Sequence, residues 1–113
     1  MSKDEITGTP VSDLVARASD VEVLDEAEEA RLVVRTASGQ DAALETLVRA
    51  HLRIAVDEAI RNRGLGAPQD RLVRVGAKAL VEAAPSYDPE EHGTFSRFAT
   101  RVVRTAIKAQ LVS

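Results

Sequence analysis

Apolar and basic residues alternate at helical spacing along residues 95–111, "FSRFATRVVRTAIKAQL". One side of a helix drawn over this segment collects an apolar set: Phe95, Phe98, Ala99, Val102, Val103, Ala106 and Ile107. Another side collects cations: Arg97, Arg101, Arg104 and Lys108. The pattern predicts a helix with a buried aromatic edge and a basic row, and Thr94 can cap its N-terminus.

A longer helix is predicted over residues 41–63, capped by Asp41. Its apolar residues step by four along one face: Leu44, Val48, Leu52, Val56 and Ile60. Charged residues of mostly alternating sign step by four along another face: Glu45, Arg49, Arg53, Asp57 and Arg61. We therefore expect a helix that is buried on one side and charged on the other.

Two further helices are predicted over residues 24–37 and 69–84. Acidic residues begin the first, where the helix dipole favours anions, and Gly39 is suited to end it. In the second, Gly76 would cost roughly 1 kcal/mol relative to alanine at an exposed position, so it indicates a close approach of helices. Residues 85–93 are expected to form a loop. Residues 1–11 are expected to be disordered, and residues 12–19 permit a short amphipathic turn.

The composition favours helices over a sheet. The 113 residues suffice for one domain, 44% are hydrophobic, and only 3% are aromatic, so the core must consist of Ala, Val, Leu and Ile. We expect an all-α fold, a compact bundle of four to five helices over residues 23–113, in which Leu44, Leu72 and Phe98 share one hydrophobic centre. Residues 1–22 are expected to form an acidic, flexible N-terminal segment.

The net charge of −3 conceals an asymmetry. Residues 1–32 hold nine acidic and three basic side chains, whereas residues 33–113 hold nine acidic and twelve basic ones. The net charge of the first part is therefore −6 and that of the second is +3, which makes the body of the domain mildly cationic.

Little in the sequence indicates catalysis. The two histidines, His51 and His92, are far apart; we expect His51 at the edge of the core and His92 in a solvated loop. The chain has no cysteine, no apolar run long enough to span a membrane and no signal-peptide core at its start. We expect a cytoplasmic protein that is not an enzyme, with no cofactor, metal, membrane or small-molecule substrate.

Residues 24–111 resemble the sigma-70 family of bacterial RNA polymerase initiation factors. The residues over 24–66 resemble the family's region 1.2 running into region 2.1, with "AHLRIA" in place of an "NLRLV"-like run. The residues over 69–107 resemble regions 2.2 to 2.4, and the specific matches are "YDPE", "GTFSRFAT" and "RTAI". The resemblance implies the helical fold of region 2, while fold and function remain separate questions.

The resemblance also implies a surface that docks on RNA polymerase, and the residues of that surface differ here from those of the family. In the family, acidic and amide side chains of the region 2.2 helix dock on the polymerase clamp, and the matching positions here are Arg71, Arg74 and Val75. Lys78 continues this basic stripe. Where the family has an acidic side chain, this chain has a basic one, so the basic surface of the polymerase clamp would repel this face. These four residues are the candidate partner-binding set.

The candidate DNA-binding residues are the cations of the basic row, which could contact a DNA backbone, and three residues that the resemblance adds: Arg97, Arg101, Arg104 and Lys108, with Tyr87, Phe98 and Thr105. Tyr87 matches the family's pocket for a flipped promoter base, and Thr105 takes the place of a promoter-reading glutamine. The family's adjacent tryptophans are replaced by Arg101 and Val102, which removes stacking surfaces for unpaired bases. An arginine pair of the family is replaced by Glu90 and Glu91, which places carboxylates where phosphates would approach.

Three hypotheses follow for the basic row and its domain. The first is a sigma-like module that binds a regulator, such as an anti-sigma factor, or RNA polymerase without opening promoters. The second is the region 2 subunit of a split sigma factor, which would bind core polymerase and −10 promoter DNA together with a separate −35 reader. The third is a nonspecific DNA-binding helical domain. The basic row can also be only a solvated face.

Overall fold

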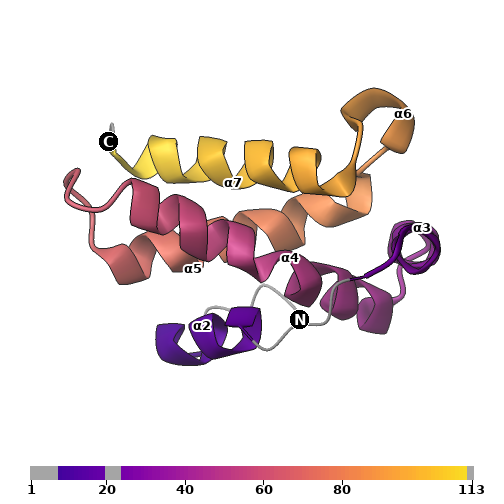
Figure 1. The fold of residues 1–113 in the computed structure, drawn as a ribbon, viewed down its shortest axis with the longest axis horizontal. Coiled ribbons are helices and arrows are strands. Elements are labelled where there is room, and N and C mark those ends of the chain that lie inside the picture. Colours follow the sequence, from indigo (N-terminus) through magenta and orange to yellow (C-terminus); the bar gives the residue numbers. More distant parts are fainter. Residues whose placement is uncertain (1–7, 20–23, 112–113) are drawn as a thin grey trace.

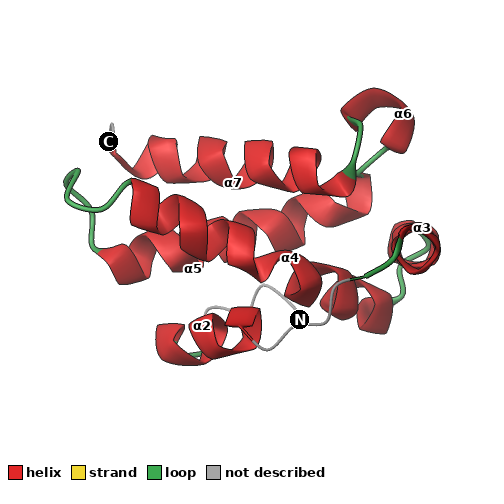
Figure 2. Cartoon of the chain, in the orientation of Figure 1, coloured by secondary structure: helices red, strands yellow, loops and turns green. Residues whose placement is uncertain are grey.

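The predicted helices are present in the structure, with small shifts at their ends. The computed structural model describes residues 8–19 and 24–111. In order along the described chain, the elements are α2 (Val11–Ser19), α3 (Glu26–Ala37), α4 (Asp41–Arg61), α5 (Gln69–Ala83), the 3-10 helix η1 (Ala84–Ser86), α6 (Pro89–His92) and α7 (Phe95–Leu111) (Figure 1). The described residues contain no strand (Figure 2), so the prediction of an all-α fold is confirmed.

Helices α4, α5 and α7 contact one another and form the centre of the bundle (Figure 1). Leu72 and Phe98 belong to one cluster of buried residues, and Leu44 packs against that cluster, which confirms the expected common hydrophobic centre. Gly76 of α5 makes the close approach possible. A Cβ atom on Gly76 would lie 3.0 Å from Cγ1 of Val103 and 3.2 Å from Cβ of Ala55.

Helix α2 belongs to the folded body. It contacts α4, and its side chains of Leu14 and Ala18 are buried in the common core, with Leu14 only 1% exposed. Residues 12–19, for which a short amphipathic turn was the expectation, form a helix that begins at Val11. Within the segment expected to be flexible, residues 11–19 form a helix that packs on α4 through the buried Leu14 and Ala18, whereas residues 1–7 and 20–22 lie outside the described residues.

The helix ends follow their capping residues, with two corrections. Asp25 caps α3 by accepting a hydrogen bond from the backbone N–H of Glu28 at 2.8 Å, and the Thr94 hydroxyl accepts one from the N–H of Arg97 at 3.2 Å. Gln40, and not Asp41, holds the N-cap position of α4. The expected loop over residues 85–93 contains η1 and α6, since Asp88 caps a short turn that Pro89 begins.

No helix in the described part of the chain is long and apolar enough to cross a membrane.

Candidate functional site

The predicted basic row lies on the exposed side of α7. Its residues, with neighbouring hydroxyl side chains, line an open hollow of about 440 Å³, and we call this set the α7 basic face: Ser96, Arg97, Thr100, Arg101, Arg104, Thr105 and Lys108. All four cations are exposed, as is Thr105. The structure thus brings together five of the seven candidate DNA-binding residues, because the spacing of α7 places them on one side.

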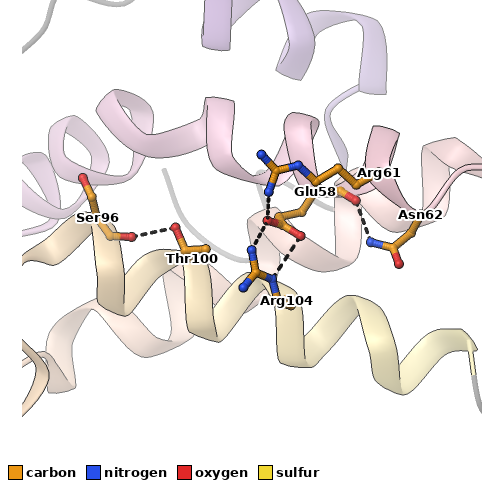
Figure 3. Close-up of polar contacts among 6 residues, drawn as sticks. All are labelled: Glu58, Arg61, Asn62, Ser96, Thr100 and Arg104. Atoms are coloured by element: carbon orange, nitrogen blue, oxygen red, sulfur yellow. Dashed lines mark hydrogen bonds and ion pairs between the residues drawn. The ribbon is translucent and has the colours of Figure 1, made fainter.

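Arg104 is held by an interhelical ion pair. Its Nη2 and Nε atoms donate to the two carboxylate oxygens of Glu58 on α4, at 2.8 and 3.3 Å (Figure 3). Arg61 donates to the same carboxylate at 3.0 Å. Glu58 is only 4% exposed, so its charge is buried between two guanidinium groups. Arg104 therefore contributes less free charge to the α7 basic face than Arg97, Arg101 and Lys108 do.

The ion pair between Glu58 and Arg104 shifts the pKa values of both side chains. The hydrogen bond from Arg104 lowers the pKa of the Glu58 carboxyl, burial opposes that shift, and the charges of Arg104 and Arg61 add to it. The hydrogen bond to Glu58 and its charge raise the pKa of Arg104. Glu58 is the residue beside this site that sequence reasoning missed. Its signal is a carboxylate at an apolar position of α4, three residues after the buried Ala55.

The aromatic side chains face inward. Four rings pack around Tyr87 and Phe98, and we call this set the aromatic cluster: Tyr87, His92, Phe95 and Phe98. It includes the only tyrosine and both phenylalanines of the chain. Phe95 is fully buried and Phe98 is 6% exposed. Phe98, one of the candidate DNA-binding residues, is therefore separated from the α7 basic face, because the apolar side of α7 turns it toward the core.

Tyr87 closes the turn between α6 and α7. Its hydroxyl donates to the carbonyl oxygen of Gly93 at 2.5 Å, and its half-buried ring packs edge-on against Phe95. Burial, followed by the charges of Glu29 and Asp88, raises the pKa of the Tyr87 phenol. The Tyr87 hydroxyl therefore has its hydrogen-bond partner within the domain.

His92 does not lie in a solvated loop as expected. Its ring is half-buried against Phe98, and its Nδ1 atom accepts a hydrogen bond from the backbone N–H of Asp88 at 3.0 Å. Glu90 and Glu91 are exposed in the same turn, close in sequence to the start of α7. They place negative charge near the N-terminal end of the α7 basic face.

The candidate partner-binding residues form a second surface, the α5 face: Arg71, Arg74, Val75 and Lys78. Arg71 is exposed, whereas the other three are half-buried. Arg74 donates a hydrogen bond to the carbonyl oxygen of Thr9 at 2.9 Å. The chain just before α2 therefore occupies part of this face, which the sequence pattern did not predict.

His51 lies at the edge of the core, as predicted, and is 7% exposed. Its Nδ1 atom lies 2.8 Å from the carbonyl oxygen of Leu47, and its Nε2 atom lies 3.2 Å from a carboxylate oxygen of Glu29. The pair joins α3 to α4 beside Phe95, at the back of the aromatic cluster.

Within residues 8–19 and 24–111, no three side chains of His, Asp or Glu converge as a metal-binding group. The α7 basic face and the α5 face carry clustered positive charge and can attract anionic or acidic surfaces. No family model matches the chain.

Proposed function

We propose that this protein is a sigma-like regulator of transcription initiation that binds another protein, an anti-sigma factor or RNA polymerase, and does not open promoter DNA itself. One observation carries the second half of this proposal: every phenylalanine and tyrosine ring of the chain is packed into the aromatic cluster. There is no tryptophan to take their place.

Promoter opening requires surfaces that receive unstacked bases. Stacking of a base on an aromatic side chain contributes about 1–3 kcal/mol, and flipping a base out of a duplex costs a few kcal/mol. Phe95 and Phe98 offer no exposed face for such stacking, and the half-buried Tyr87 ring packs against both of them. The aromatic surface left for unstacked bases is therefore too small to compensate for melting.

Protein binding is supported by the α5 face. Arg71 is exposed, and the half-buried Lys78 lies two turns along the same helix, so this face carries positive charge next to the apolar Val75. Cations beside an apolar side chain are suited to an acidic protein surface, because complementary charge steers association and apolar contact holds the complex. A basic surface would be repelled.

Two assays on the full chain test the proposal. In a pull-down from native bacterial extract, we expect RNA polymerase or an anti-sigma factor to be recovered, and Arg71→Asp with Lys78→Asp to reduce that recovery. A matched control replaces Arg31 and Arg35, which are exposed on α3, with Asp and should retain it. With core polymerase and promoter DNA, permanganate footprinting should detect no melted bubble. A bubble that depends on this protein would contradict the proposal.

The open α7 basic face favours a second candidate, the region 2 subunit of a split sigma factor that contacts −10 promoter DNA together with a −35-reading partner. Phosphate contacts need only clustered cations and weaken with salt. Replacing Arg97, Arg101 and Lys108 with Gln should then abolish a salt-sensitive mobility shift on promoter DNA, while the same change at Arg31, Arg35 and Arg53 should not. The first candidate predicts no specific shift in either variant or in wild type.

A further inference from the structure

An apolar hollow lies between α2, the C-terminal end of α4 and the start of α5. Its volume is about 520 Å³, and most of its lining is aliphatic: Val11, Val15, Val56, Ile60, Ala67 and Val73. None of its lining residues belongs to the α7 basic face or to the α5 face. The elements that line it meet at the end of the bundle that carries the α4–α5 loop, and Figure 1 shows that α3 and α6 lie at the opposite end.

Exposed apolar side chains gather around this hollow. Four large hydrophobic residues are exposed in the described chain, and three of them lie here: Val15, Ile60 and Leu65. Val15 and Ile60 line the hollow, while Leu65 is 58% exposed in the loop that follows. A group of exposed aliphatic side chains beside an apolar hollow is typical of a protein-binding surface.

The loop between α4 and α5 exposes Leu65 to solvent. The glycines on either side of it, Gly64 and Gly66, have φ angles of +80° and +110°, in a region of backbone conformation that other residues rarely adopt. Gly64 also lines the hollow, as does Ala67. A projecting leucine and the hollow that could receive one are therefore neighbours on the same loop.

We propose that this surface is the contact of a homodimer, in which Leu65 of each copy enters the apolar hollow of the other. A two-fold axis brings the same patch of both copies together, so a projection and a recess that adjoin on one copy face the matching recess and projection on the second. An unrelated partner would use either the projecting Leu65 or the hollow. A second copy of this chain uses both, because each copy supplies one projection and one hollow.

The hollow also carries charges of both signs, so two copies of the same patch can be electrostatically complementary. Arg63 and Asp70 are exposed, of opposite sign, and both line the hollow. In the proposed dimer, Arg63 of one copy faces Asp70 of the second, and the two-fold axis forms the same pair twice. Complementary charge at the rim of an apolar contact fixes the register of association and excludes surfaces of one sign.

The test is the mass of the full chain in solution. In sedimentation equilibrium from about 1 to about 500 µM, a range that covers weak and moderate homodimers, the mass should rise from 12.1 kDa toward twice that value. Leu65→Asp should weaken the dimer by at least about tenfold. Val34→Asp is the matched control, since Val34 is 66% exposed on α3, and it should leave the dimer unchanged. Circular dichroism checks that each variant retains its helical content.

A charge exchange tests the two-fold arrangement itself. Arg63→Asp and Asp70→Arg should each weaken the dimer, and the double variant should restore it, because the pairs re-form with their signs reversed. A wild-type chain that stays monomeric over the whole range, or a dimer that withstands Leu65→Asp, overturns the proposal. So does a double variant no tighter than the single ones. These measurements need neither polymerase nor DNA, so their failure is separate from failure of the proposed function.

Discussion

Glu58 of α4 and Arg104 of α7 form a two-point contact, with Nη2 and Nε of the guanidinium each donating to one carboxylate oxygen (Figure 3). The two residues are 46 positions apart in the chain. Their pairing joins the longest helix of the bundle to the helix that carries the α7 basic face. It keeps a buried carboxylate charged and holds one cation of that face in place.

Replacing Arg104 with Gln should destabilise the protein by about 1–3 kcal/mol, because it removes two charge-assisted hydrogen bonds from a buried carboxylate and leaves it paired with Arg61 among the described residues. Urea unfolding measures the effect. The matched control is Arg101→Gln on the exposed face of the same helix, which should change the free energy of unfolding by less than about 0.5 kcal/mol. Equal effects of both changes would contradict a structural role for the pair.

The free energy of unfolding should also depend on pH through Glu58. Its folded-state pKa lies below its ordinary value of 4.5, so its contribution to stability is fully present above about pH 4.5 and is lost as pH falls through the folded-state value. In a series of urea titrations between pH 7 and acid, Glu58→Gln should show a smaller loss of stability below pH 4.5 than wild type. Parallel curves for the two proteins would show that Glu58 does not carry this dependence.

Thr36→Val should stabilise the protein by about 1 kcal/mol. The Thr36 residue on α3 is 3% exposed, and its hydroxyl has no hydrogen-bond partner in the described structure, so burying it costs free energy that a methyl group would not. Thermal unfolding gives the measurement. Thr46→Val is the control, because the Thr46 hydroxyl donates to the carbonyl oxygen of Ala42 at an exposed site, and no gain is expected there.

Gly76→Ala should destabilise the protein by about 1 kcal/mol, although alanine favours helices by a similar amount, because the added Cβ would press on Val103 and Ala55. A double-mutant cycle with Val103→Ala provides the control. Removing the Val103 methyl groups should make room, so the double variant should be more stable than the sum of the single effects predicts. Strict additivity would argue against the close approach of α5.

Leu14→Ala should destabilise the whole domain by about 2–4 kcal/mol, since Leu14 is buried in the common core. The change tests whether α2 folds with the bundle. Val15→Ala, one residue further and 37% exposed, should cost less than about 1 kcal/mol. If Leu14→Ala left the cooperative unfolding transition unchanged, α2 would not contribute to the stability of the domain.

The sequence by itself determined most of the helices and the residues that each helix buries. Apolar spacing located α3, α4, α5 and α7 to within two residues at either end, and Thr94 was correctly predicted to cap α7. Gly76 could be read as a close contact because glycine is unfavourable in a helix without such a reason. These features depend on neighbours within about one helical turn, which a single segment contains.

Only the tertiary structure decided which charged residues form ion pairs between helices and which remain exposed to bind a partner. Glu58 lies at an apolar position of α4, and its partner Arg104 becomes identifiable only once α4 and α7 are packed together. Likewise Arg74 meets the carbonyl oxygen of Thr9, and α2 docks through Leu14, by contacts that no periodicity encodes. Helical spacing specifies a face within one element, whereas the partner of that face depends on how all the elements pack.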